Sequence, residues 1–390
     1  MGMRRIPIGD FPIGTEEREA ILRVLDSGRI SEHREVRAFE EEFADWMDVE
    51  HCVAVSSGTA ALICGLQALK YAGYVPSYPR VLIPALTFIA AANAAALSGY
   101  RITFIDVDDS FTMRPWPEWE AGDVVLPVHL FGYPAAMGRI KERAQEQKFI
   151  VVEDAAEAHG ATSHGDKVGS LGLWGAFSFY IAHTIQAGEF GALVTNDPLI
   201  AGIARSIKAH GRLCACKRCL RSEGKCPNLK DGDPRSTFKY IGYNFKPMEF
   251  QAALARVQLS KIEENIAKRN ENVARLVDLL RPLGGVIKSY YGDRNAVLMA
   301  YPIVLNKKGI RNRVIAELEK RGVECRPLFG CIPTQQPSYS EYKDEYRGRL
   351  PIAEHFGANG FYIGCHQYLD RDDIQYAAKQ VVEVVKEMAC

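Results

Sequence analysis

The sequence predicts an α/β fold, with a mostly parallel sheet flanked by helices and a smaller α+β C-terminal domain. Two observations carry this prediction. Short apolar runs rich in β-branched residues alternate with helical stretches between residues 51 and 197, and the C-terminal part mixes one apolar run with amphipathic helices. Strands that alternate with helices are typical of parallel sheets covered on both faces. Sheets of this kind bind ligands at the carboxyl ends of their strands.

The composition is that of an ordinary globular protein, and it excludes several classes of function. The 390 residues include 48 Lys and Arg and 48 Asp and Glu, so no excess of charge indicates a nucleic acid or membrane partner. No apolar run reaches the roughly 18–20 residues that span a bilayer. The opening stretch "MGMRRIPIGD" lacks the apolar core of a signal peptide, and we therefore expect a cytoplasmic protein.

Two helices are expected before the first strand. The stretch "GTEEREAILRVLDSG" places apolar residues on one helical face, and Gly28 is expected to end it. In the next helix, apolar side chains recur at helical spacing, at Val36, Phe39, Phe43 and Trp46. Strands are then expected in the runs "HCVAVSS", "RVLIPAL", "YRITFIDV", "DVVLPVHLFG", "FIVVEDAA" and "GALVTND".

A basic, Cys-bearing stretch between about Pro198 and Asn244 interrupts this alternation. It is too long and too polar for a tight connection, so we expect an excursion with a function of its own. A long helix from about Met248 to Leu280 should then lead into the C-terminal part. The predicted units are therefore a large domain over 1–265, with the excursion at about 205–235, and a small domain over 266–390.

Three short motifs could bind a ligand, and each also has a purely structural explanation. In "VSSGTAAL", small residues stand between a strand and a helix, where Gly58 would let an anion approach free helix amides. Glu153 and Asp154 end a buried strand, where a carboxylate can pair with a protonated ring nitrogen or cap a helix. Phe88 follows another strand and could cover a flat cofactor or pack in the core.

The order of these motifs is more specific than any one of them. A phosphate turn, an aromatic residue, a strand-end Asp and "SFY" before a reactive position resemble the fold-type I, aspartate aminotransferase-like pyridoxal phosphate enzymes. More narrowly, the sequence resembles the DegT family of sugar-nucleotide aminotransferases. The resemblance extends over almost the whole chain, from "GRISEHREVRAFEEEFADWM" through "SSGTAAL" and "EDAAEAHGA" to "GYNFKPMEFQAAL" and "RPLFG".

The resemblance implies a cofactor site assembled from several parts of the chain. The amides of Gly58 and Thr59 and the hydroxyl of Ser178 would hold the cofactor phosphate. Phe88 would stack on the pyridine ring, and Asp154 would pair with the ring nitrogen.

Two more residues follow from the same resemblance. Glu157 would lie near the ring hydroxyl, where many relatives have Gln. Asn244 in "GYN" corresponds to a phosphate contact that the family draws from a neighbouring subunit. This contact implies a homodimer with shared active sites.

His183 is the main departure from the family pattern. The residue five places after the Ser of "SFY" is a lysine in the aminotransferases, and here it is His183. An imidazole has no primary amine with which to bind pyridoxal covalently, but it can accept a proton near neutral pH. The same change is found in a branch resembling the nucleotide-sugar 3-dehydratases. That resemblance implies free pyridoxamine 5'-phosphate as cofactor, regenerated from pyridoxal 5'-phosphate, and His183 as the catalytic base.

The implied reaction removes the 3-hydroxyl of a nucleotide-linked 4-keto-6-deoxyhexose, and glutamate would recharge the cofactor. Two alternatives stay open at this point. One is a sugar aminotransferase whose Schiff-base lysine has been substituted. The other is a non-catalytic relative that uses its Cys loop as a metal-bound docking surface.

Four cysteines crowd into "CACKRCLRSEGKC" on the excursion, where they suit zinc or an iron–sulfur cluster or are simply reduced thiols. In one subgroup of the 3-dehydratases, three cysteines in this region and one upstream hold an iron–sulfur cluster, but here the upstream position is Ala156. A cluster would imply a partner reductase; without one, elimination followed by hydrolysis would release ammonia. The candidate metal ligands are Cys214, Cys216, Cys219 and Cys226.

Overall fold

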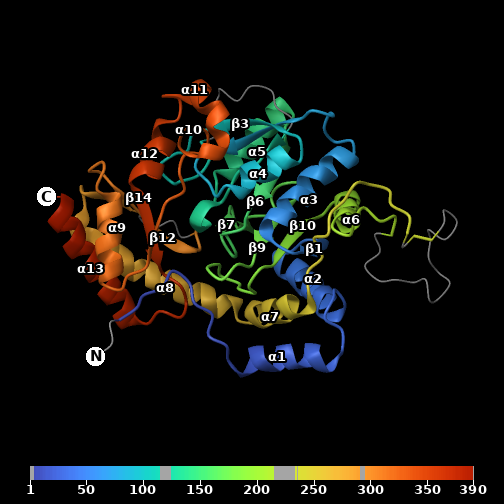
Figure 1. Cartoon of the computed structure of the whole chain (residues 1–390), viewed down its shortest axis with the longest axis horizontal. Coiled ribbons are helices and arrows are strands. Elements are labelled where there is room, and N and C mark those ends of the chain that lie inside the picture. Colours follow the sequence, from blue (N-terminus) through green and yellow to red (C-terminus); the bar gives the residue numbers. More distant parts are fainter. Residues whose placement is uncertain (1–3, 115–123, 215–232, 235, 290–294, 390) are drawn as a thin grey trace.

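The central sheet consists of two hydrogen-bonded groups of strands that one chain segment joins. The computed structural model describes residues 4–114, 124–214, 233–234, 236–289 and 295–389 (Figure 1). Its central strands have the orders β1-β10-β9-β6 and β3-β2-β4-β5. Between β5 and β6, the Val152 amide donates to Val125 O at 3.0 Å, and the next amide, of Glu153, donates to Trp174 O at 2.9 Å. The two groups are therefore neighbours in one sheet.

The strands of this sheet are short. Their bounds are β1 (His51–Val55), β2 (Arg80–Pro84), β3 (Arg101–Ile105), β4 (Val124–Val125), β5 (Ile150–Val151), β6 (Glu153–Asp154), β9 (Gly175–Ser178) and β10 (Gly191–Thr195). All pairs are parallel except those of β10, which is antiparallel to β1 and β9. The mostly parallel sheet is thus confirmed. Strand β10 is the exception because the chain doubles back directly after β9, which produces antiparallel pairing.

The helices of this part flank the sheet (Figure 1). Their bounds are α1 (Thr15–Asp26), α2 (Arg34–Met47), α3 (Gly58–Tyr71), α4 (Ala90–Leu97), α5 (Met137–Gln147), α6 (Pro198–Ile207), α7 (Glu249–Ser260) and α8 (Ile262–Leu280). A small hairpin is formed by β7 (Thr162–Ser163) and β8 (Asp166–Lys167). Within the described ranges, no helix is both long enough and apolar enough to cross a membrane.

Strand β1 shows why both faces of the sheet are covered. Val53 and Val55 lie in the same hydrophobic core as α3, whereas Cys52 and Ala54 lie in the core that α2 completes. Successive side chains of a strand point to opposite faces, so a strand that is apolar throughout must be covered twice.

A second sheet, antiparallel and smaller, forms the C-terminal part. Its order is β11-β12-β14-β13, with bounds β11 (Ile287–Ser289), β12 (Ala300–Leu305), β13 (Cys325–Pro327) and β14 (Gly360–Gly364). The helices here are α9 (Arg311–Lys320), α10 (Ile332–Gln335), α11 (Lys343–Tyr346), α12 (Pro351–Asn359) and α13 (Arg371–Ala389). Helices α9 and α13 lie together beside this sheet (Figure 1). The predicted α+β character of this part is confirmed.

Two expectations about helices need correction. The single long helix expected up to Leu280 is broken at Lys261, whose backbone leaves the helical region and whose ammonium pairs with Glu17 of α1 at 2.8 Å. The interruption expected from Pro198 begins later, because Asp197 caps α6 and a proline is favourable in the first helical turn. The predicted boundary between 265 and 266 falls inside α8.

The N-terminal segment links the C-terminal sheet to the turn between β9 and β10. The Ile6 amide donates to Gly322 O at 2.8 Å, and the Glu324 amide donates to Ile6 O at 2.9 Å. At Gly9, a Cβ atom would lie 2.8 Å from the Cα of Ala182. The backbone of the segment therefore packs directly on the β9–β10 turn.

Candidate active site

A cavity of about 560 Å³ lies at the carboxyl ends of the parallel strands. Its walls come from the β1–α3 turn, the segment between β2 and α4, the segment after β6, the β9–β10 turn and the C-terminal part. The structure places seven sequence-predicted site residues around it: Gly58, Thr59, Phe88, Asp154, Glu157, Ser178 and His183. Residues far apart in sequence meet here because parallel strands end at the same edge of a sheet.

The β1–α3 turn provides an anion cradle. Ser57 caps α3 by accepting the Ala60 amide at 3.1 Å, and the amides of Gly58 and Thr59 belong to the first turn, where no acceptor exists inside the helix. A Cβ on Gly58 would lie 2.7 Å from the Cβ of Ser178, so the glycine allows Ser178 to approach the helix end. Helix amides beside a hydroxyl suit a phosphate group.

The adjacent acids Glu153 and Asp154 have different surroundings. The carboxylate of Glu153 is fully buried and accepts four hydrogen bonds, from His129 Nε2 at 3.0 Å and from the amides of Gly169, Leu171 and Gly172 at 2.9, 2.7 and 2.6 Å. Glu153 therefore holds the loop before β9 in place and has a structural role.

Asp154 lines the cavity and accepts the Ala156 amide at 3.1 Å. Burial raises the pKa of its carboxyl to about 6, against the opposing effect of that hydrogen bond. A cationic group in the cavity would favour the carboxylate and lower this pKa. The position suits a partner for a protonated ring nitrogen.

Glu157 is a second acid in the cavity wall. Its Oε2 accepts the Phe131 amide at 2.6 Å. Burial and, to a smaller extent, the nearby charge of Asp154 raise its pKa to about 8, against the opposing effect of the hydrogen bond from the Phe131 amide. At neutral pH the Glu157 carboxyl is therefore mainly protonated, and a protonated carboxyl can donate a hydrogen bond into the cavity.

His183 lies on the β9–β10 turn and is 7% exposed. Its Nδ1 is 2.8 Å from Ser178 O, and because a carbonyl oxygen can only accept, Nδ1 carries the proton and Nε2 keeps a free lone pair. Burial lowers the pKa of the imidazole to about 4, well below the unperturbed value from which the sequence argument started. The ring is therefore neutral at neutral pH, which is the state of a base.

The C-terminal part closes the cavity with residues that sequence reasoning did not assign: Met299, Arg326, Phe329 and Tyr362. Arg326 and Phe329 belong to "RPLFG", a motif that indicated the family without indicating their roles. Phe329 meets Phe88 edge to face, with ring centroids 5.6 Å apart. Phe88 is 53% exposed, so the alternative that it packs in the core is wrong.

Asn244 and Cys214 are not among the residues that line this cavity. Asn244 is exposed and is not among the lining residues, so its contact with a neighbouring subunit stays a prediction. Cys214 is half-buried with a free thiol, whereas Cys216, Cys219 and Cys226 lie outside the described residues. Within the part of the chain that the structure describes, no group of three His, Cys, Asp or Glu side chains could hold a metal ion. The metal site stays a prediction too.

The described residues fit a pyridoxal-type cofactor. An anion cradle, an exposed aromatic side chain at Phe88 and a buried acid at Asp154 converge on one cavity. The volume of about 560 Å³ lies within the range of small-molecule sites.

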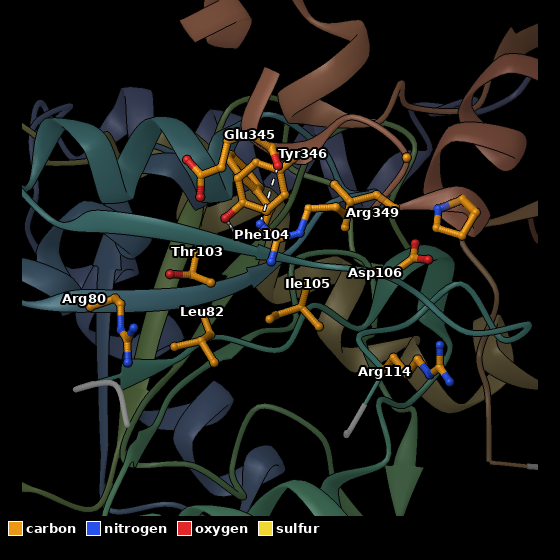
Figure 2. Close-up of a pocket in the computed structure, with 13 residues that line it drawn as sticks. Arg80, Leu82, Thr103, Phe104, Ile105, Asp106, Arg114, Glu345, Tyr346 and Arg349 are labelled. Carbon is orange, nitrogen blue, oxygen red and sulfur yellow. Dashed lines mark hydrogen bonds between the residues drawn. The ribbon is translucent and has the colours of Figure 1, made fainter. Parts of the chain in front are cut away.

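A second cavity, of about 660 Å³, lies beside the edge strand β3 and its neighbour β2 and contains none of the predicted residues (Figure 2). Two of its polar side chains serve the packing of the fold. Asp106 accepts the amides of Ile352 at 3.2 Å and Ala353 at 2.9 Å at the start of α12. The Tyr346 hydroxyl accepts the Phe104 amide at 3.1 Å (Figure 2).

Comparison with known proteins places the chain among sugar-nucleotide enzymes. It is 32% identical to GDP-perosamine synthase of Caulobacter vibrioides, over 95% of both chains. It is 27% identical to GDP-4-keto-6-deoxy-D-mannose 3-dehydratase of Escherichia coli O55:H7, over 92% of this chain and 95% of the other.

A solved structure agrees with these relatives. A histidine-to-asparagine mutant of GDP-4-keto-6-deoxymannose-3-dehydratase with bound GDP-perosamine superposes with a TM-score of 0.85 at 25% identity, over 97% of this chain and all of the other. The predicted aminotransferase-like fold class is confirmed. Residues 12–382 match the DegT/DnrJ/EryC1/StrS aminotransferase family, and the chain belongs to that family.

Proposed function

We propose that this protein is a pyridoxamine 5'-phosphate-dependent 3-dehydratase that acts on a nucleotide-linked 4-keto-6-deoxyhexose. His183 carries the proposal, because it lines the cavity with a free Nε2 and has no primary amine for covalent attachment of pyridoxal. The site otherwise keeps an anion cradle and a buried acid, which a non-catalytic relative would not require.

When bound, the cofactor would supply the two electrons that replace C3–OH by C3–H, as its aminomethyl group becomes an aldehyde and ammonia is released. Glutamate would return the amine and leave as 2-oxoglutarate. Overall, one glutamate reduces one sugar, and ammonia and 2-oxoglutarate form in equal amounts.

The residues of the chain have separate tasks in this proposal. Nε2 of His183 accepts a proton, while the hydrogen bond from Nδ1 to Ser178 O holds the ring in place. Asp154 would hold the cofactor ring through its nitrogen, and the protonated Glu157 would donate to the ring hydroxyl oxygen. The amides at the start of α3 bind the phosphate.

The relatives support this proposal and one alternative. A 3-dehydratase is among them, and a mutant of such an enzyme at a histidine is among the similar solved structures. A perosamine synthase at 32% identity favours instead a nucleotide-sugar aminotransferase whose lysine has been replaced. The two reactions differ in whether nitrogen leaves as ammonia or stays on the sugar.

We also propose a homodimer in which Asn244 reaches the phosphate site of the partner subunit. Asn244 is exposed and does not line the cavity of its own chain, which supports this arrangement. The zinc or iron–sulfur site at the Cys loop would be a further addition, and metal analysis of the purified protein tests it directly.

One assay separates the two reactions. Protein loaded with pyridoxamine phosphate is mixed with a nucleotide-linked 4-keto-6-deoxyhexose and glutamate, and the products are identified by mass spectrometry. A dehydratase yields a 3-deoxy sugar with ammonia and 2-oxoglutarate in a one-to-one ratio. An aminotransferase yields an amino sugar and no ammonia. Failure to bind pyridoxamine phosphate would contradict both.

The position of His183 has its own test. The His183→Lys variant should bind pyridoxal phosphate covalently, which is visible as a new absorbance band and as a mass increase after borohydride reduction. If neither is seen, the side chain at this position does not face the cofactor aldehyde.

A further inference from the structure

A buried guanidinium contacts the β9–β10 turn that carries His183, called the reactive turn below. Arg269 on α8 is fully buried, and its Nη2 donates to the carbonyl oxygen of His183 at 3.0 Å. Its Nη1 donates to Leu298 O at 3.2 Å and to Met299 O at 2.8 Å. Met299 lines the same cavity as His183. One side chain therefore ties the reactive turn to the cavity wall that the C-terminal part provides.

Arg269 forms no ion pair with an acid in the described part of the chain. Burial lowers its pKa to about 10, so the guanidinium is still charged at neutral pH. Buried charges are normally paired with an opposite charge, because desolvation is unfavourable. Here three carbonyl dipoles take the place of a counter-ion. An apolar side chain would avoid that penalty, so the charge and its geometry require another explanation.

The charge of Arg269 acts on His183. A cation close to an imidazole disfavours the imidazolium, and Arg269 thus adds to the effect of burial. The rings of His159 and Tyr180 also face the His183 ring, at centroid distances of 6.2 and 6.0 Å. The other titratable groups around the same cavity are Asp154, Glu157, Glu189, Arg326 and Tyr362.

We propose that Arg269 is a positioning residue for His183, which holds the reactive turn against the cavity wall through three carbonyl oxygens and disfavours a positive charge on the imidazole. This inference rests on the proposed role of His183 as the base. Arg269 does not line the cavity, so it acts through His183 and not on the substrate.

Asn272 offers a matched control on the same helix. It is fully buried, three residues beyond Arg269, and donates to His366 O at 3.0 Å and Leu369 O at 3.2 Å. These hydrogen bonds fix the C-terminal part and do not reach the reactive turn. Loss of Asn272 therefore removes buried hydrogen bonds of the same kind without changing the charge near His183.

The test compares Arg269→Met, Arg269→Lys and Asn272→Leu with the wild type. The pKa of His183 is followed by NMR titration without substrate or cofactor, with its signals assigned through the His183→Asn variant. Thermal unfolding and the rate of elimination are measured on the same samples. Arg269→Met should raise the pKa of His183 and slow elimination roughly 10- to 100-fold, the usual effect of losing a group that orients a reactive one.

The other two variants separate charge from geometry and from stability. Arg269→Lys keeps the charge without the planar fork, so the pKa of His183 should stay close to that of the wild type while elimination slows. Asn272→Leu should unfold at a lower temperature with an unchanged His183 titration. If Arg269→Met leaves the titration unchanged, or if Asn272→Leu shifts it equally, Arg269 is only structural. The titration needs no turnover, so this result is independent of whether the dehydratase reaction is found.

Discussion

The two cavities differ less in size than in the state of their polar groups. In the larger one, beside β2 and β3, both carboxylate oxygens of Asp106 accept backbone amides. In the smaller one, Asp154 and Glu157 have pKa values raised by burial, and His183 keeps a free ring nitrogen. Titratable groups with strongly shifted pKa values in a cavity indicate a candidate site of chemistry, whereas volume alone does not.

The consecutive acids Glu153 and Asp154 show the same difference in hydrogen bonding as the two cavities. Glu153 and Asp154 are consecutive acids at one strand end, yet the first is saturated by hydrogen bonds and the second faces the cavity. Sequence alone treats both as candidates. The structure distinguishes them by counting the partners of each carboxylate.

Among the substitutions that test the difference between the two cavities, removal of the proposed base should slow the reaction most. The His183→Asn variant should lose roughly 10²- to 10⁴-fold in the rate of elimination, the usual contribution of a general base. Binding of pyridoxamine phosphate should survive, because the phosphate cradle and Asp154 are unchanged. A single-turnover measurement with preloaded protein gives the rate. A variant as fast as the wild type would show that His183 is not the base.

The Asp154→Asn variant should mainly weaken cofactor binding. Loss of a hydrogen bond to a charged group costs about 1.5–3 kcal/mol, which is roughly a 10- to 150-fold increase in Kd. The Kd for pyridoxamine phosphate can be measured by fluorescence titration. The Glu153→Gln variant is the control: it should destabilise the fold because its buried amides lose an acceptor. If Asp154→Asn and Glu153→Gln raise the Kd equally and are equally stable, Asp154 is not a cofactor partner distinct from the structural acid Glu153.

Glu157 should make stability depend on pH. Its pKa of about 8 in the folded chain lies above the ordinary value of 4.5, so the folded chain binds this proton more tightly than the unfolded chain. Stability should therefore fall as pH rises from about 4.5 to 8, and the Glu157→Gln variant should lose less stability over this window. Thermal unfolding of the ligand-free proteins at pH 5 and pH 8 measures the difference. An identical pH dependence in both proteins would contradict the assigned protonation state.

The smallest effect on activity is expected in the second cavity. The Asp106→Asn variant should lose about 1 kcal/mol of stability, as for a weakened helix cap, because Asp106 holds the start of α12. Its elimination rate should equal that of the wild type. Urea unfolding and the product assay check both statements. A loss of activity comparable to that of Asp154→Asn would make the second cavity functional and overturn the comparison.

Local sequence patterns were sufficient for the sheet, whereas the grouping of the site residues came from the order of motifs that resembles the DegT family. Apolar runs predict the strands, and strands β1, β6 and β9, which run in the same direction, end at the edge where Gly58, Asp154 and His183 meet. Arg269 could not be found in this way, because an Arg in a charged amphipathic helix normally faces solvent. The break at Lys261 was missed for a related reason, since the sequence there contains neither Gly nor Pro.

The N-terminal segment has a consequence for biosynthesis. Gly9 leaves the ribosome early, but it packs on Ala182, and the backbone of Pro7 lies so close to Gly364 that no Cβ would fit there. The support of the reactive turn thus needs strand β14, which is translated long after the β9–β10 turn itself. A nascent chain can form most of the central sheet while this support is still missing. Completion of the reactive turn should therefore wait until strand β14 has been synthesised.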